Sequence, residues 1–208
     1  MIRIEMVNKN VSQMEMAAKV FARAFQQEGI NRYVYDFSNE KIEALLEKHI
    51  FEDLIFNMKN NGYSLLVALQ DDEVVGAALI KKHMEEKKPL INKVKEVLRK
   101  IRISLPLVVH MKIRNTIKLA KGVSLTNKLE SNHIILSALA VFPEHQGKGI
   151  GKLLLAEVHR ISNDSGAPGT YLYTADEKNK RLYERLKYKL IENKAAGELT
   201  IHHMYRTN

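Results

Sequence analysis

The pattern of hydrophobic and polar positions predicts that the chain begins with a strand and a helix. Residues 2–7 alternate between apolar and polar side chains, which is typical of a short strand. Residues 14–26 instead carry apolar side chains at helical spacing, with Ser12 as the expected N-cap and Glu15 at the capping-box position. Gly29 is expected to end this helix.

A second helix and a strand hairpin are predicted next. Apolar residues recur at near-helical spacing over residues 38–59, and the sequence NNG that follows is a typical helix end. Residues 63–70 and 73–83 are strand-like, and the Asp71-Asp72 pair between them favours a tight turn.

An almost unbroken apolar run lies in the second half of the chain. Residues 134–141, IILSALAV, are apolar on both alternating faces, which predicts a central strand buried on both sides. A glycine-rich turn follows directly. Beyond it the pattern predicts a helix from about residue 150 to 161, a strand at 170–175, a short helix around 181–187, and strands at 188–192 and 198–206.

Positive charge is concentrated in one segment between the third and fourth predicted strands. Residues 81–128 contain 14 Lys and Arg against 3 Asp and Glu, a local charge of +11, so the rest of the chain carries −2 of the net +9. Apolar spacing predicts one amphipathic helix that starts at Pro89 and a second over residues 105–119 that closes near Gly122. The two form a basic helical insert at approximately residues 85–128.

The basic insert allows three interpretations. It can be a solvated cationic face whose apolar stripe packs on the domain, or a lid over an acceptor groove that favours an acidic substrate or attracts an anionic coenzyme. It can also be a surface that binds an anionic membrane or RNA. Residues 81–128 contain no Phe, Tyr or Trp, so there is no platform for stacking single-stranded bases and nucleic-acid binding is not favoured.

Composition excludes several classes of site. The chain has no cysteine, which rules out disulfides, a cysteine-based zinc site and a thiol nucleophile and agrees with a reducing cytoplasm. The N-terminal residues lack a signal-peptide pattern, and no stretch reaches about 18 uninterrupted apolar residues. The eight histidines show no H-E-x-x-H spacing, and His202 and His203 face opposite sides of a strand. We therefore expect a cytoplasmic protein with no transmembrane segment and no metal.

The glycine-rich turn at PEHQGKGIG is the strongest chemical signal. A strand, a flexible turn and a helix together present backbone N–H groups and the positive end of a helix dipole to a phosphate. A Walker A loop is excluded because Gln146 stands where its first glycine is needed and Leu153 where Ser or Thr is needed. A dinucleotide fingerprint is excluded because Lys152 stands at its last glycine.

The pattern that fits is Q/R-x-x-G-x-G/A, formed by Gln146, Gly149 and Gly151. With this turn before a helix and LYERLKY some thirty residues later, the chain resembles the GNAT superfamily of acetyl-coenzyme A dependent N-acetyltransferases. The resemblance covers nearly the whole chain in the order of its elements, except for the basic insert. It implies one domain over residues 1–208 with an α/β (α+β) fold, in which helices flank a mixed, mostly antiparallel sheet.

The resemblance also implies how acetyl-CoA is held. Turn amides would bind the coenzyme pyrophosphate, and the edge of the central strand would pair with the pantetheine arm where the fourth and fifth strands splay apart. A backbone N–H around Val141 would stabilise the tetrahedral oxyanion. The implied cofactor-binding residues are Leu139, Ala140, Val141, Gln146, Gly147, Lys148, Gly149, Ile150, Gly151, Lys152 and Asn179.

Tyr183 stands where the family commonly has a tyrosine that protonates the departing coenzyme A thiolate, so the resemblance implies that it is catalytic. Asn179 matches an asparagine of the branch that includes the puromycin-type small-molecule acetyltransferases. The chain departs from the family pattern at Lys187, where glycine is usual, and at Tyr188, where phenylalanine is usual. We expect Tyr188 to serve packing.

The acceptor and its base are not fixed by any motif. Restoring the neutral form of an aliphatic amine at pH 7 costs about 4.6 kcal/mol, so a base or a desolvating pocket must help. Candidate bases are Glu28, Asp36, Glu130, His133 and Ser137.

Two functions are compatible with the sequence. The favoured one is acetyl transfer from acetyl-CoA, by direct attack in a ternary complex, to a primary amine of a small molecule or peptide. The alternative is a coenzyme A-binding sensor that uses the basic insert to engage an anionic partner; Tyr183 favours the enzyme. Homodimerisation through the last strands is left open.

Overall fold

The computed structural model describes residues 1–83, 90–126, 129 and 132–208, with the backbone alone described for residues 90–95. Within this part of the chain, seven strands form one sheet in the order β1-β2-β3-β4-β5-β7-β6. The strands are β1 (Ile2–Met6), β2 (Tyr63–Gln70), β3 (Glu73–Lys82), β4 (Ile134–Val141), β5 (Gly169–Thr174), β6 (Lys189–Ala196) and β7 (Leu199–Thr207). Only the β4–β5 pair is parallel in this order. This is the mixed, mostly antiparallel sheet that the resemblance implies.

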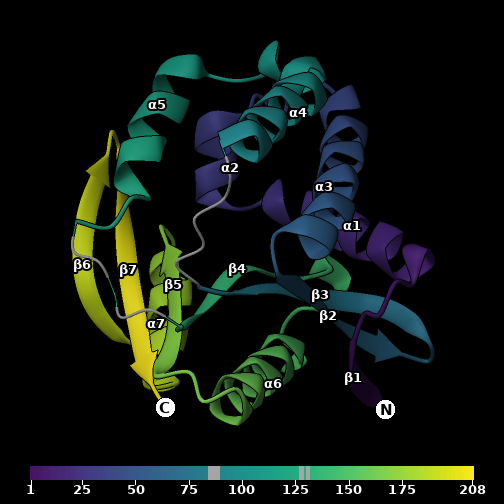
Figure 1. The fold of residues 1–208 in the computed structure, drawn as a ribbon, viewed down its shortest axis with the longest axis vertical. Coiled ribbons are helices and arrows are strands. Elements are labelled where there is room, and N and C mark those ends of the chain that lie inside the picture. Colours follow the sequence, from purple (N-terminus) through teal and green to yellow (C-terminus); the bar gives the residue numbers. More distant parts are fainter. Residues whose placement is uncertain (84–89, 127–128, 130–131) are drawn as a thin grey trace.

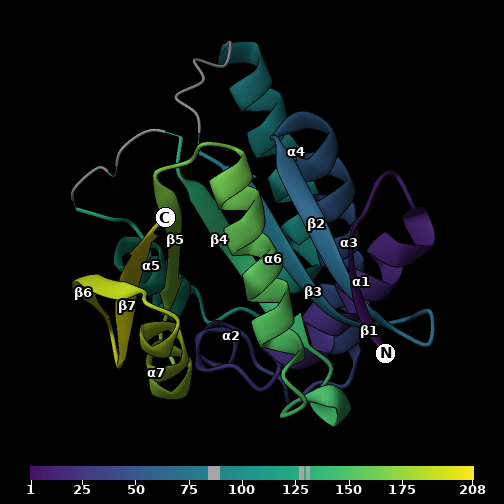
Figure 2. The same cartoon turned by 90° about the horizontal axis from the view of Figure 1, so that it is seen from below.

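Helices cover both faces of the sheet. They are α1 (Val11–Phe25), α2 (Gly29–Val34), α3 (Lys41–Asn60), α4 (Leu90–Val108), α5 (Ile113–Gly122), α6 (Ile150–Asp164) and α7 (Glu177–Arg185), with a short 3-10 turn, η1, at Pro143–His145. Figure 1 shows α1, α3 and α4 on one side of the sheet and α6 on the other, and Figure 2 gives the view from the α6 side. The predicted basic insert is present as α4 and α5, between β3 and β4.

Two apolar layers hold this arrangement together. On one face, α1 and α3 bury Phe21 and Leu54 against the inward-facing side chains of β2 and β3. On the other face, α6 buries Leu154 and Val158 in a second cluster, whose strand residues include Leu136. Burying an aliphatic or aromatic side chain of this size contributes about 1.5–3 kcal/mol, so the two layers fix the position of β4 in the middle of the fold.

The start of the chain differs from the sequence prediction in its caps. The N-cap of α1 is Asn10, whose side-chain oxygen accepts a hydrogen bond from the Gln13 backbone N–H at 3.2 Å, and not Ser12. Asn and Ser are about equally good caps, so sequence alone did not separate the two positions. Gly29 begins the short helix α2 and does not end α1. The extended backbone of Glu28 separates the two helices, which brings the carboxylate of Glu28 next to the sheet.

The helices of the basic insert also differ from the prediction. The predicted second helix over residues 105–119 is wrong at its start, because α4 continues to Val108 with Pro106 inside it, and α5 begins only at Ile113. A proline within a helix removes one hydrogen bond, so its presence near the end of α4 made a helix boundary the natural expectation. The predicted start at Pro89 lies outside the described residues.

The last helix begins earlier than predicted and ends in a left-handed turn at Lys187. It starts at Glu177, where the sequence suggested Arg181, because Asp176 caps it. Lys187 then adopts a left-handed conformation with φ 68°, and the Tyr188 N–H donates to the Tyr183 carbonyl at 3.0 Å. Lysine therefore takes the conformation that glycine adopts most readily, and the turn into β6 is a standard helix C-terminus.

Candidate functional site

The site begins where β4 and β5 separate. The two parallel strands pair only at their first residues, Ile134 with Thr170 and Ile135 with Tyr171. From Leu136 onward, β4 remains paired with β3 on its other side but has diverged from β5. The edge of β4 facing the gap therefore offers backbone N–H and C=O groups to a ligand that lies alongside it like an added strand.

This separation also explains why β4 is less buried than predicted. Ser137 is exposed, and Ala138, Leu139 and Val141 are only partly buried. The sequence predicted that both faces of the strand are buried. Beyond Ile135, however, β5 no longer lies beside one edge of β4, and the side chains there are more exposed. A bulge adds to the opening, because Leu79 pairs with Ala138 and Ile80 with Leu136, which leaves Ser137 as an extra residue.

A cavity of about 770 Å³ occupies the gap. Its walls come from β4, from the β5 residues Leu172, Tyr173 and Thr174, from the glycine turn, from the segment after α1, and from α7. Segments far apart in the sequence thus meet around one opening. Its size lies within the usual range for sites that hold cofactors or drug-sized ligands.

The glycine turn forms one end of the cavity. Gly147 and Gly149 have φ of 77° and 82°, a left-handed conformation that side chains with a Cβ adopt only at a cost. Gly149 is the N-cap of α6, and the N–H groups of Lys152 and Leu153 both donate to its carbonyl, at 3.0 and 3.2 Å. The N–H groups of Ile150 and Gly151 precede these bonds at the positive end of the helix dipole, where an anion is stabilised.

Gly151 leaves room for a ligand to approach the backbone. A Cβ built on Gly151 would meet only the Cγ2 of Val141, at 4.0 Å. Gln146 has a different role from the amides, since its side-chain nitrogen donates to the Val141 carbonyl at 3.2 Å. It therefore ties the turn to the end of β4.

The structure gathers nearly all of the predicted cofactor residues around this cavity. The lining residues among them are Leu139, Ala140, Val141, Gln146, Gly147, Gly149, Ile150, Gly151, Lys152 and Asn179. Lys148 is exposed and is not among the lining residues. The chain therefore brings the turn and the β4 edge together around one opening.

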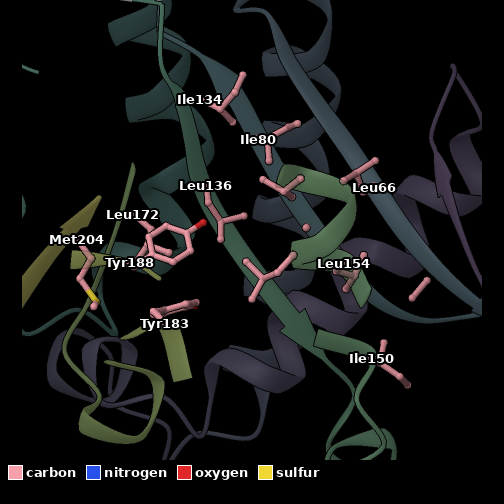
Figure 3. Close-up of a cluster of buried hydrophobic side chains, with 14 of the residues drawn as sticks. Leu66, Ile80, Ile134, Leu136, Ile150, Leu154, Leu172, Tyr183, Tyr188 and Met204 are labelled. Atoms are coloured by element: carbon pink, nitrogen blue, oxygen red, sulfur yellow. The ribbon is translucent and has the colours of Figure 1, made fainter. Parts of the chain in front are cut away.

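Tyr183 contributes the α7 wall of the cavity. Its side chain is 8% exposed and packs edge-to-face with Tyr188, with ring centroids 5.6 Å apart. Figure 3 shows the two rings between Met204 of β7 and Leu136 of β4. Burial, followed by the negative charges of Glu28 and Asp176, raises the pKa of Tyr183 above its usual value. The phenol is therefore protonated at neutral pH and available as a hydrogen-bond donor.

Tyr188 occupies a packing position. It is 2% exposed, and its hydroxyl lies 2.9 Å from Nε2 of His159 on α6. Its hydroxyl thus bonds within the protein core, and it does not line the cavity.

Glu28 is the candidate base that the structure places in the cavity. Its carboxylate accepts a hydrogen bond of 2.7 Å from the side-chain amide of Asn31. Burial raises the pKa of Glu28, the charge of Asp176 raises it further, and the bond from Asn31 opposes both effects. A carboxylate with a raised pKa is a stronger base than an exposed one.

The other candidate bases differ in whether they line the cavity. Ser137 also lines the cavity, whereas Asp36 is exposed and does not. His133 is buried at the paired start of β4 and stacks on His83, with ring centroids 4.7 Å apart, away from the lining residues. Glu130 lies outside the described residues.

Sequence reasoning missed several residues of the site. Tyr173 of β5 lines the cavity, and Asp176 both lines it and caps α7 by accepting hydrogen bonds from the N–H groups of Lys178 and Asn179, at 2.7 and 2.9 Å. The order Asp-x-Lys-Asn before an amphipathic stretch is a helix-start signal that could have located Asp176. Asn31, which holds Glu28, carried no such signal.

The described part of the chain lacks two further features. Among the described residues no group of three or more His, Cys, Asp or Glu side chains comes together as a metal site. Within the same residues, no helix combines the length and apolar character needed to cross a bilayer.

Comparison with known proteins gives one family and several similar structures. A model of the acetyltransferase (GNAT) family matches residues 31–188. No curated protein matches the chain. A structure of a histone acetyltransferase HPA2 and related acetyltransferase from Corynebacterium glutamicum is 15% identical with a TM-score of 0.66, covering 99% of this chain and 96% of that one.

Two further similar structures have more specific descriptions. The PaiA N-acetyltransferase of Thermoplasma acidophilum, in complex with coenzyme A, is 15% identical with a TM-score of 0.60, covering 99% of each chain. The polyamine N-acetyltransferase of Drosophila melanogaster, which forms N-acetylagmatine, is 16% identical with a TM-score of 0.58, covering 99% of this chain and all of that one. At these identities the likeness concerns the fold. Because the family model spans most of the sequence and the sheet has the expected order, this chain belongs to the acetyltransferase (GNAT) family.

Proposed function

We propose that this protein transfers the acetyl group of acetyl-CoA to a primary amine of a small molecule or peptide, by direct attack in a ternary complex. The observation that carries the proposal is one cavity that combines an anion-binding helix start, a free strand edge, a buried tyrosine and a carboxylate. The N–H groups of Ile150 and Gly151 are suited to the pyrophosphate of the coenzyme. The free edge of β4 is suited to the amides of its pantetheine arm.

Each of these groups has a role in the proposed acetyl transfer. Bound acetyl-CoA supplies an activated thioester. Glu28 accepts a proton from the acceptor ammonium, and the neutral amine attacks the thioester carbonyl to form the new C–N bond. As the C–S bond breaks, the nitrogen of the adduct loses its second proton to solvent, which leaves a neutral amide. A backbone N–H near Val141 stabilises the negative charge on the carbonyl oxygen.

Tyr183 donates its hydroxyl proton toward the departing sulfur. Complete transfer from a phenol with a raised pKa to a thiolate with a pKa near 8.5 is uphill, so the hydrogen bond must strengthen as negative charge develops on the sulfur. Only a tyrosine held within hydrogen-bond reach can do this. The buried, packed position of Tyr183 suits that role.

An amine panel tests the proposal. Saturating acetyl-CoA is mixed with agmatine, spermidine, an aromatic monoamine or a lysine-containing peptide, and release of free thiol is followed. We expect turnover above the rate of thioester hydrolysis with at least one acceptor. Coenzyme A binding without turnover on any acceptor would instead support a sensor.

Replacing Glu28 with glutamine tests the proposed base. We expect Glu28→Gln to lower kcat at neutral pH by about 10²-fold or more, which is the usual contribution of a positioned base. The defect should shrink as the pH approaches the amine pKa of about 10.4, because the acceptor then arrives neutral without help. The measurement is kcat against pH for both proteins.

The same substitution has the opposite effect on stability. The folded-state pKa of Glu28 lies above its ordinary value of 4.5, so its ionisation opposes folding at neutral pH and has no effect once the pH falls below 4.5. We therefore expect Glu28→Gln to raise the thermal midpoint at pH 7 and to leave it unchanged at about pH 4. Exposed Glu15 on α1 provides the control, and Glu15→Gln should change neither kcat nor the midpoint. Equal kcat in Glu28→Gln and the parent protein would refute the assignment.

A further inference from the structure

Helix α4 carries two apolar faces, of which only one packs on the protein. On the inner face, Ile103 and Leu107 are buried against the rest of the fold. Arg99 on the same side pairs with Asp53 of α3 at 2.6 Å and lies over the ring of Phe56 at 3.8 Å. These contacts anchor one side of α4 to α3.

The opposite side of α4 is apolar and exposed. At 100° per residue its members fall within an arc of about 100°, roughly opposite Ile103 and Leu107. Their exposed fractions range from 41% at Val108 to 65% at Leu105. This set, the outer α4 face, consists of Val97, Leu98, Ile101, Leu105 and Val108.

Helix α4 lies at the periphery of the molecule. Figure 1 places α4 at the top of the fold beside α3, and Figure 2 shows its N-terminal turns extending past the sheet. Monomeric soluble proteins expose scattered apolar side chains, but a contiguous stripe along a helix marks an interaction surface.

The charge of the helical insert that carries this stripe points to an anionic partner. Over residues 96–126 the described basic side chains are Arg99, Lys100, Arg102, Lys112, Arg114, Lys118 and Lys121, and the one acidic side chain is Glu96. All of these basic residues except Arg99 are exposed. Apposition of two copies of this face would bring like charges together, which opposes self-association. The absence of Phe, Tyr and Trp from residues 81–128 leaves no stacking surface for single-stranded RNA.

We propose that the outer α4 face docks onto an anionic lipid bilayer. A helix with an apolar stripe and a basic surround lies in the plane of the membrane interface, with its apolar side chains at the boundary between headgroups and acyl chains. The 19 residues of α4 make a helix about 28 Å long, enough for several side chains to insert together. Lys100 and Arg102 are exposed, border the stripe on α4 and would meet the negative headgroups, and the exposed lysines and arginines of α5 add to the positive charge of the insert. This docking is independent of the proposed acetyl transfer.

Vesicle flotation tests the proposal with the full chain. The probes are large vesicles of phosphatidylcholine alone and of phosphatidylcholine with a third of phosphatidylserine, at low and at physiological salt. We expect binding to the anionic vesicles only, weakened by salt. Leu98→Gln combined with Ile101→Gln and Leu105→Gln should lower the partition coefficient by about tenfold or more, because three inserted side chains lose their apolar surface.

A second variant removes the charge. Lys112→Glu combined with Arg114→Glu and Lys118→Glu should also weaken binding by more than about tenfold, since each basic residue near an anionic surface contributes to binding. The matched controls lie on other elements. They are Leu190→Gln with Ile191→Gln for the apolar variant, and Arg181→Glu with Arg185→Glu and Lys189→Glu for the charge variant.

The controls also define what overturns the proposal. All variants replace exposed side chains, so thermal midpoints and acetyl transfer to a soluble amine should stay at the parental level. No binding to anionic vesicles at low salt, or equal loss in the controls, refutes the proposal. So does binding of an RNA oligonucleotide, or a dimer in solution, that depends on Leu98, Ile101 and Leu105 while vesicle binding does not.

Discussion

We expect Tyr183→Phe to lower kcat for acetyl transfer by about 10²–10⁴-fold, the usual contribution of a positioned acid. The substitution removes only the hydroxyl, so the ring still packs against Tyr188 and the cavity keeps its wall. The affinity for coenzyme A should therefore change little. Steady-state kinetics with a good acceptor, together with calorimetry of coenzyme A binding, separate the two effects.

Tyr188→Phe is the matched control for this result. It removes a hydroxyl that bonds to His159 in the core, outside the cavity lining. Losing one such bond should lower stability by about 1 kcal/mol and leave kcat unchanged. Unchanged kcat in Tyr183→Phe would show that the tyrosine is structural and that the thiolate leaves without its proton.

Gly151→Asp is expected to abolish most of the coenzyme affinity without harming the fold. A Cβ fits at this position, and an acidic residue in the first turn of a helix stabilises it by about 0.3–1 kcal/mol. The same carboxylate would oppose the pyrophosphate, and two unit charges 4 Å apart near a protein surface interact by about 4 kcal/mol. We expect the Kd for coenzyme A to rise by more than about a hundredfold.

Two variants separate charge from other causes. Gly151→Ala adds the Cβ without the charge and should cost little affinity. Val11→Asp places a carboxylate in the first turn of α1, which has no acidic residue there, and should stabilise that helix without changing coenzyme binding. If Gly151→Asp binds coenzyme A as well as the parent protein does, the pyrophosphate does not lie at the start of α6.

The part of the site that sequence predicts best is the part made by local backbone geometry. Gly147 and Gly149 adopt left-handed conformations, which glycine favours, so the glycines in the sequence mark these positions directly. The apolar run of β4 before the turn is equally local. Together they locate the end of the cavity where we propose that the pyrophosphate binds, and the resemblance to known acetyltransferases adds the separation of β4 from β5.

The end of the cavity that we propose for the acceptor could not be predicted in the same way. Glu28, Asn31 and Asp176 are ordinary polar residues in their own segments, and they meet only because α2 and α7 border the same cavity. The caps show the same limit on a smaller scale. Asn10 and Ser12 are equally suitable N-caps on local grounds, so the sequence does not identify which of them caps α1.

In the basic helical insert, the periodic pattern predicts the type of secondary structure correctly but not the bounds of the helices. Its apolar spacing predicts helices, which the structure contains, but α4 runs through Pro106 because packing of Leu107 against α1 and α3 outweighs the lost hydrogen bond. The stripe on the far side of α4 has the same periodicity as the packed one. Sequence alone does not tell which stripe faces the protein, and only the exposed fractions of Leu98, Ile101 and Leu105 do.

The most direct test of the account is an amide NMR titration of the protein with coenzyme A. The account predicts that the largest shifts fall on the backbone N–H groups of Ile150 and Gly151 and their neighbours in the turn, with smaller shifts along the free edge of β4. Binding that leaves these amides unmoved, or no binding at all, would contradict it.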